Sequence, residues 1–254
     1  MVAPPRGTAC SGEGLHMKRT MKFKWLLAGL LVPLLGGCAS IHKSADLGDL
    51  DQVDRLLAKG VAVDARDDFG RTPLMWAVGD LAAVRYLVER GADVDARDAN
   101  GETALMKAAF VGSLDVVKYL VQRGADVNGR SETGRTPLMR AAGNLDVAKH
   151  LVAQGADVNA QDAGGDTALR WAATFGDLGV VKYLVRQGAD ANVRDNRGQT
   201  PLGWARAFGH HDVADFLERK REAADAGNIE GKSPRQKAAD ETGRAGWLLA
   251  ADAR

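Results

Sequence analysis

The sequence contains only two cysteines in 254 residues, Cys10 and Cys38. With so few thiols, the chain has neither a disulfide framework nor a cysteine-based zinc site. Its five histidines do not stand at metal-ligand spacing, and no glycine-rich phosphate-binding loop is present. We therefore expect no catalytic residues, no metal site and no cofactor, and the sequence predicts a protein that is not an enzyme.

An excess of charge of one sign is also missing. The chain carries 34 Lys and Arg against 33 Asp and Glu, a net charge of +1. Residues 1–37 hold five basic residues and one acid, so the remainder holds 29 basic and 32 acidic residues, a net charge of −3. Neither a basic stripe nor an RNA-binding aromatic pattern appears along the sequence. We therefore expect no nucleic-acid partner.

The apolar run near the start is too short to cross a bilayer comfortably. Residues 25–35 form an uncharged stretch of about 11 residues, whereas a membrane-spanning helix needs roughly 20. Four Lys and Arg at positions 18–24 precede it, and a basic start followed by a short apolar stretch predicts a secretory signal. Residues 1–16 do not fit such a signal, so we expect an upstream extension and translation from Met17 or Met21.

The apolar run ends in Leu35-Gly36-Gly37-Cys38. Small residues before a cysteine resemble the bacterial lipobox, which implies cleavage before Cys38 and a covalent lipid on its thiol and new amino terminus. By the same resemblance, Ala39 in place of an aspartate implies the periplasmic face of the outer membrane. An ordinary signal cleaved nearby, with Cys38 incidental, is the alternative. Residues 1–37 are then the extension and signal, and residues 38–40 the lipidated start of the mature chain.

A five-residue frame, G-x-T-x-L, recurs five times along the chain. Its glycines are Gly70, Gly101, Gly134, Gly165 and Gly198, which lie 31, 33, 31 and 33 residues apart. A period of this size indicates a stack of supersecondary units, none of which can bury its apolar face alone. The period therefore predicts a solenoid.

Each unit carries the signals of two helices. A pair such as Thr136-Pro137 suits a helix start, because Thr accepts an amide hydrogen bond and Pro fits the first turn. Small pairs such as Ala141-Ala142 allow neighbouring first helices to approach closely. A second helix, for example residues 114–121, ends at a glycine such as Gly124, which favours a left-handed C-cap.

These runs resemble the ankyrin repeat family, whose hallmark sequences are T-P-L-H-x-A-A and G-A-D-V-N. The resemblance covers residues 41–220 and implies an all-α repeat solenoid of helix–turn–helix–β-hairpin units with about six helix pairs. The expected units are an N-terminal cap at 41–67 and repeats at 68–98, 99–131, 132–162, 163–195 and 196–220. We expect residues 221–254 to be a disordered tail, unless its apolar patch Trp247-Leu248-Leu249 docks on the array or on a partner.

Two departures from the family pattern stand out. The family histidine after T-P-L is retained only in the cap, as His42, so its hydrogen bonds must be absent or replaced elsewhere. Its substitutes in the five repeats are Met75, Met106, Met139, Arg170 and Gly203. The 31-residue units also lose two residues between their helices, so only the longer turns expose an extra aromatic, Phe110 or Phe175. Duplication of a two-unit block explains this alternation without any function.

One first-helix position lies between the family's Leu-His and Ala-Ala and, by the resemblance, faces the concave groove. We call the residues at this position the groove column: Lys43, Trp76, Lys107, Arg140, Trp171 and Trp204. Trp and Arg are enriched in binding hot spots, so the column predicts a partner-binding surface. The alternative is that these long side chains cover the groove floor and pack on adjacent helices.

Two further sets are candidates for the same surface. The turn aromatics are Phe110, Phe175 and Phe208. The hairpin tips, or fingertips, present Asp68, Phe69, Arg71, Asn100, Glu102, Glu132, Arg135, Asp166, Asn196, Arg197 and Gln199. Polar residues are the default in turns, so the charge of the tips adds little to the prediction.

The resemblance to ankyrin repeats implies a protein that binds another protein without chemistry of its own. Joined to the lipobox, it predicts a monomeric binding module that is anchored to the membrane by lipid and faces the periplasm. Inhibition of an envelope enzyme, or protection against a toxin as an immunity protein gives, is the role we favour. A structural scaffold of a cell-envelope assembly, or an accessory protein in periplasmic oxidative-stress defence, is the alternative.

Overall fold

The computed structural model describes residues 40–230, with side chains as far as residue 223. The described residues belong to one compact unit. The predictions for the signal, for Cys38 and for residues 231–254 fall outside the described residues.

The described residues form six helix pairs stacked in chain order. The first helices are α1 (Ile41–Asp46), α3 (Pro73–Trp76), α5 (Ala104–Val111), α7 (Pro137–Arg140), α9 (Ala168–Phe175) and α11 (Pro201–Ala207). The second helices are α2 (Leu50–Ala58), α4 (Leu81–Glu89), α6 (Leu114–Gln122), α8 (Leu145–Ala153), α10 (Leu178–Arg186) and α12 (His211–Glu230). A 3₁₀ turn, η1 (Ala77–Gly79), follows α3. The predicted all-α solenoid is confirmed.

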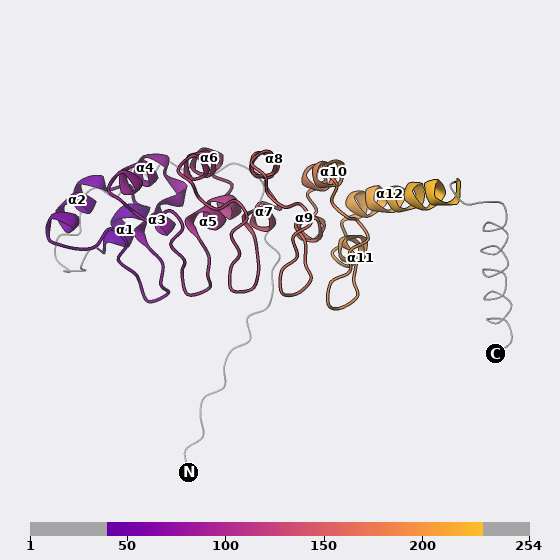
Figure 1. The fold of residues 1–254 in the computed structure, drawn as a ribbon, viewed down its shortest axis with the longest axis horizontal. Helices are drawn as coiled ribbons and strands as arrows, with labels where there is room; N and C mark the ends of the chain where they lie inside the picture. Colours follow the sequence, from indigo (N-terminus) through magenta and orange to yellow (C-terminus); the bar gives the residue numbers. More distant parts are fainter. Residues whose placement is uncertain (1–39, 231–254) are drawn as a thin grey trace, which may run out of the picture. The chain divides into compact units, whose positions relative to one another are not determined.

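Neighbouring pairs contact each other helix by helix. Each first helix from α1 to α9 contacts the next first helix, and α4, α6, α8, α10 and α12 make a second such series. Figure 1 shows the second helices along one edge of the stack and the loops between pairs along the opposite edge. These loops occupy the place of the expected β-hairpins, but no residue between 40 and 230 is in a β-strand. We keep the word hairpin for these loops.

The helix starts follow the Thr signals of the sequence. In four of the five repeats the Thr Oγ1 accepts a hydrogen bond from the amide three residues later, as when Met106 N donates to Thr103 at 3.3 Å. Thr72 lacks such a bond, and its hydroxyl is buried without a partner. Pro73, Pro137 and Pro201 each open a first helix, where their missing amide costs nothing.

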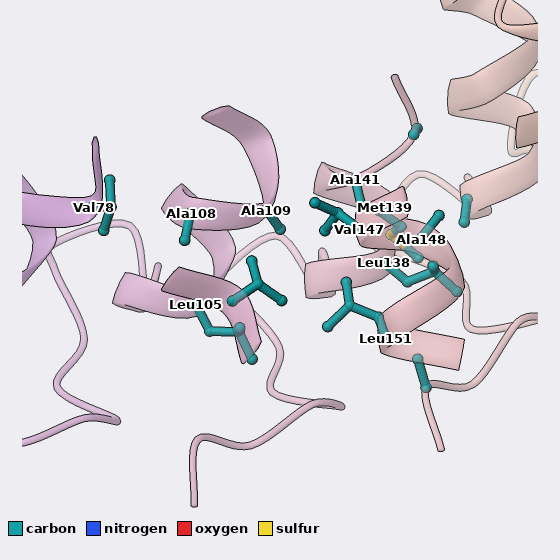
Figure 2. Packing of buried hydrophobic residues seen from close by; sticks show 14 of the residues in the cluster. Val78, Leu105, Ala108, Ala109, Leu138, Met139, Ala141, Val147, Ala148 and Leu151 are labelled. Atoms are coloured by element: carbon teal, nitrogen blue, oxygen red, sulfur yellow. The ribbon is translucent and has the colours of Figure 1, made fainter. Parts of the chain in front are cut away.

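The core contains one leucine row on the first helices, a second leucine row on the second helices, and pairs of alanines between adjacent first helices. Leu105 and Leu138, at equivalent positions of successive repeats, are completely or almost completely buried. Figure 2 shows Ala108 and Ala109 of α5 facing the next repeat, where Ala141, Val147 and Ala148 gather around Leu138. Because the alanines are small, the helices approach closely and each repeat covers the leucines of its neighbour.

Backbone hydrogen bonds tie each hairpin to the next one. Ala99 N donates to Phe69 O, and the same bond recurs one repeat further as Glu132 N to Asn100 O, at 3.0 and 2.9 Å. Two more such bonds follow along the array. The hairpins are therefore held in a fixed register along the stack.

The alternation of 31- and 33-residue units changes the length of the first helix. In the 31-residue units α3 and α7 have four residues each, whereas α5 and α9 have eight and end at left-handed glycines, Gly112 and Gly176. Gly143 in a short unit has no such conformation. The short units thus lack the last turn of the first helix. Phe110 and Phe175 at the ends of the long helices are exposed, as expected from the sequence.

Helix α12 runs to Glu230, beyond the repeat boundary expected at residue 220. The preceding second helices stop before glycines in positive φ, such as Gly155 and Gly188. Arg221 stands at the corresponding position, four residues after Leu217 as Gly188 is four after Leu184. Without a glycine there, and with Glu and Ala following, the helix continues.

A matched pair of alanine substitutions tests the role of the left-handed cap. Gly176 has φ +74°, and a Cβ there would overlap the imidazole ring of His210. We expect Gly176→Ala to lower the free energy of unfolding by about 1–2 kcal/mol or more, because the left-handed conformation and the contact both penalise a side chain. Gly143→Ala, whose Cβ would meet only the Phe175 ring at 3.9 Å, should cost much less. Urea unfolding followed by circular dichroism measures both, and equal losses would contradict this explanation.

Candidate binding groove

The residues of the groove column lie on the first helices, beside the hairpins. Its six side chains differ in solvent exposure: Lys43 is exposed, and the other five are half-buried. Most of them have partners within the array, and these partners come from the hairpins.

In the first repeat, the carboxylate of Asp67 at the base of the hairpin accepts four hydrogen bonds. One oxygen of Asp67, Oδ1, accepts hydrogen bonds from the amides of Phe69 and Arg71, both at 2.9 Å. The other oxygen, Oδ2, accepts from the Trp76 indole Nε1 at 3.0 Å and from Arg71 Nε at 2.8 Å. The Arg71 guanidinium also stacks on the Trp76 ring, 4.1 Å from its centroid. One carboxylate thus closes the hairpin and holds it against the first helix.

The pKa of Asp67 reflects these contacts. Burial raises the pKa, but the Arg71 amide, the Trp76 indole, the Phe69 amide and the Arg71 guanidinium all donate to the charged form and together lower it to about 2. The ionised carboxylate is therefore the form that the fold stabilises.

The same device recurs in two other repeats. Asp98 accepts from the amides of Asn100 and Glu102 and lies 2.7 Å from Lys107 Nζ. Asp195 accepts from the amides of Arg197 and Gln199 and, at 2.7 Å, from Trp204 Nε1. In each case the acid precedes the column residue by nine positions. We call the acid and its column partner the hairpin latch.

Arg140 and its hairpin form no latch. The hairpin residue nine positions before Arg140 is Ser131, which closes its hairpin through Oγ but cannot neutralise a guanidinium. Arg140 instead pairs with Glu102 of the preceding hairpin, and its guanidinium lies 5.8 Å from the Phe110 ring centroid. Burial lowers the pKa of Arg140, opposed by the charge of Asp98.

Trp171 is the one tryptophan of the column without a latch. Asp162 lies nine residues earlier, but its Oδ2 is 3.7 Å from Arg135 Nε, and the Trp171 Nε1 is buried without a hydrogen-bond partner. The ring is covered by two guanidinium groups, from Arg135 at 4.6 Å and Arg170 at 4.0 Å. Cation–π contact holds Trp171 where a hydrogen bond holds Trp76 and Trp204.

The lost family histidine is replaced in different ways. The retained His42 is buried, and its Nε2 lies 2.8 Å from Ala65 O and 3.0 Å from Arg71 O, so it ties α1 to the first hairpin. Arg170 at this position forms an ion pair with Asp166 and lies over the Trp204 ring of the next repeat at 4.8 Å. The methionines at this position, such as Met106, are buried and fill the space with apolar atoms.

Exposed apolar side chains form a second row on the same helices. Leu47, Val111, Phe175 and Phe208 each stand directly before a left-handed glycine and are between 50% and 68% exposed, and Phe110 is 60% exposed. We call these five residues the apolar row. The sequence analysis named its three phenylalanines and missed Leu47 and Val111, which the shared position before the glycine could have revealed.

A hollow of about 300 Å³ lies beside the apolar row. It opens where the short α3 and η1 leave room next to α5, with Met75 and Val78 on one side and Phe110 and Val111 on the other. Its polar walls are Glu102, Lys107 and Arg140, which already pair with one another or with Asp98.

The fingertip candidates divide into two groups. Arg71, Glu102, Arg135 and Asp166 turn toward the groove column, where each is part of an ion pair. The remaining tip residues are exposed: Asp68, Phe69, Asn100, Glu132, Asn196, Arg197 and Gln199. Phe69 is the one apolar residue in this exposed group, and Arg71 lies 4.8 Å from its ring centroid.

Two searches of the described residues gave negative results. Between residues 40 and 230, no group of three or more His, Cys, Asp and Glu side chains is arranged to hold a metal ion. In the same range, no helix combines the length and the apolar character needed to cross a membrane.

Comparison with known families identifies the class of protein. A model of three ankyrin repeats matches residues 22–98, 41–131, 95–162 and 143–228, so most of the chain is covered. The chain therefore belongs to the ankyrin repeat family, whose members are typically protein-binding modules without catalytic activity. No curated protein matches the chain significantly.

The hairpin latch can be tested with two equivalent substitutions. Trp204→Phe removes the donor to the buried Asp195, so we expect the free energy of unfolding to fall by about 1–3 kcal/mol. Trp171→Phe removes a nitrogen that has no partner, so it should cost less than about 0.5 kcal/mol beyond the small change in packing. Urea unfolding at neutral pH compares the two, and an equal cost would show that the latch does not stabilise the fold.

The lowered pKa of Asp67 predicts an acid-sensitive contribution to stability. Because the folded pKa of about 2 lies below the unfolded value of 3.8, the contribution is complete above pH 3.8 and is lost as the pH falls toward 2. We expect Asp67→Asn to lower the free energy of unfolding by about 1–2 kcal/mol at neutral pH. The free energy of unfolding of this variant should also depend less on pH between pH 3.8 and 2. Unfolding free energies measured from about pH 5 to pH 2 check this, and parallel curves would contradict it.

Proposed function

We propose that this chain is a membrane-anchored, periplasm-facing binding module that holds another protein against its groove. The apolar row carries this proposal. Five apolar side chains that are at least half exposed stand at the carboxyl ends of first helices, so each leaves much of its apolar surface in contact with water. Exposed apolar side chains that gather on one side of a protein are typical of interaction sites.

The pairing of the groove charges indicates what the partner presents. Lys107 and Arg140 are both neutralised by Asp98 and Glu102, so an acidic partner would have to displace existing ion pairs. An apolar segment would instead cover Phe110 and Val111 and enter the hollow beside them without breaking any pair. We therefore propose an apolar contact surface on the partner. Lys43, which is exposed, is the column residue that remains for direct contact.

The start of the array supports the proposed anchor. Helix α1 begins at Ile41, and the amide of Lys43 donates to the N-cap Ser40 at 3.3 Å, so the helix starts three residues after Cys38. A lipid on Cys38 would place the array close to the membrane surface. A groove held there would cover part of an envelope protein, and in this role we propose inhibition of an enzyme or protection against a toxin.

Capture of the partner from the cell envelope tests the groove. We expect the full-length protein to retain one stoichiometric partner, and Phe110→Ala with Phe175→Ala to weaken that retention at least tenfold. The double variant should remain folded, because both rings are at least half exposed, and circular dichroism checks this. Phe69→Ala is the matched control, since its ring is equally exposed but lies at a hairpin tip. If Phe69→Ala loses the partner and the double variant retains it, the partner binds the fingertips, and the proposal that it binds the apolar row is refuted.

Cys38→Ala tests the anchor separately. We expect the variant to appear in the soluble fraction after a high-salt wash of the membranes, while it still binds the partner. A variant that stays with the washed membranes would refute lipidation at Cys38 and leave the groove proposal intact.

A further inference from the structure

The second helices carry a row of cations at one equivalent position. Arg85, Lys118, Lys149 and Lys182 stand on α4, α6, α8 and α10 and are 33, 31 and 33 residues apart. All four side chains are exposed. We call them the second-helix cations.

These cations differ from those of the groove in their pairing. Of the four, only Lys149 has a carboxylate within ion-pair distance among the described residues, namely Asp146 at 3.4 Å. Arg123 and Arg186, at the carboxyl ends of α6 and α10, are likewise exposed and without such a partner in the described part of the chain. In the groove column, by contrast, Lys107 and Arg140 both have partners.

The second helices are basic although the chain beyond residue 37 is acidic. From α4 to α10, the second helices and the two residues after each hold seven basic and three acidic residues. The basic residues are Arg85, Arg90, Lys118, Arg123, Lys149, Lys182 and Arg186, and the acidic ones are Glu89, Asp115 and Asp146. Since the chain beyond residue 37 has a net charge of −3, the acids are concentrated elsewhere, above all in the hairpins.

The arrangement fits a plane of negative charge. Packed helices lie about 8–10 Å apart, so four successive second helices spread their cations over roughly 24–30 Å. The aromatic ring nearest two of these cations is buried: Tyr119 has Arg85 at 5.3 Å and Arg123 at 4.9 Å over its ring. Tyr86 and Tyr183 on neighbouring second helices are half-buried. A buried ring cannot stack on a base, as proteins that bind single-stranded nucleic acid require. The row therefore favours lipid headgroups over nucleic acid.

We propose that the second-helix cations rest on the anionic phospholipid headgroups of the membrane to which the chain is anchored. The place of this contact in the cell rests on the proposed anchor, whereas the affinity for headgroups does not. Figure 1 shows the hairpins at the opposite edge of the stack from the second helices. With the second helices on the membrane, the hairpins and the groove beside them remain accessible to a partner.

Vesicle binding by the unlipidated protein tests this contact without the anchor. A chain of residues 39–254, which includes every described residue and lacks Cys38, is mixed with phosphatidylcholine vesicles with or without about one third phosphatidylglycerol, and binding is measured by co-sedimentation. We expect binding only to the anionic vesicles, despite the acidic net charge. It should disappear as the salt approaches about 1 M, where electrostatic attraction is screened within about 3 Å.

Two double variants of equal charge change locate the surface. Lys118→Gln with Lys182→Gln should weaken binding to anionic vesicles roughly 25-fold, because each cation near such a surface contributes about fivefold. Lys43→Gln with Arg197→Gln removes two exposed cations from the first-helix and hairpin side and should change binding less than about twofold.

Three outcomes would overturn the proposal. They are equal binding to neutral vesicles, equal loss in both double variants, and tighter binding to a single-stranded oligonucleotide than to anionic vesicles. None of these depends on lipidation or on a protein partner. Failure here is therefore distinct from retention of Cys38→Ala on washed membranes, which would refute the anchor.

Discussion

Each helix pair of this array can bury its leucines only against the next pair, and this constraint governs the rest of the structure. Because every repeat must present one apolar face to the repeat before it and a complementary face to the repeat after it, Leu105, Leu138 and their equivalents recur in one register and are buried in every unit. Because the register is fixed, the side chains at any one repeat position point in the same direction along the whole stack. Residues 31 or 33 apart in the sequence become neighbours on one face, and the surface is sorted into rows with different chemistry.

The hairpins follow the same register but are fixed by electrostatics rather than by apolar burial. Asp67, Asp98 and Asp195 satisfy two amides of their own hairpin and one donor from the groove column. Hydrogen bonds lower the pKa of Asp67 and of Asp195 although burial raises it, so in these two latches the charged carboxylate joins loop to helix at neutral pH. This explains why most residues of the groove column are half-buried rather than exposed: their side chains already contact other residues of the array.

The fold could be predicted from the sequence alone, because it depends on periodicity. The contacts of the column were not predictable in the same way. Trp76 and Trp171 have the same residue type and the same acid nine positions earlier, yet only Trp76 donates to its acid, since Arg135 from the neighbouring hairpin lies next to Asp162. That difference depends on a side chain 36 residues away from Trp171. The extension of α12, by contrast, could have been predicted from the missing glycine at Arg221.

The charges show most clearly what a linear reading misses. A search for a basic stripe finds none, because Arg85 and Lys118 are separated by 33 residues that include the acids of a hairpin. Stacking of the repeats brings these residues next to each other. The net charge of the whole chain therefore describes neither the groove face nor the face of the second helices. One face has paired charges and exposed apolar side chains, which suits a protein partner and tolerates salt. The other has exposed cations with few acids, which suits an anionic surface and weakens with salt. The same 31- and 33-residue spacing that buries the leucines therefore gives the array two surfaces that can be occupied at once.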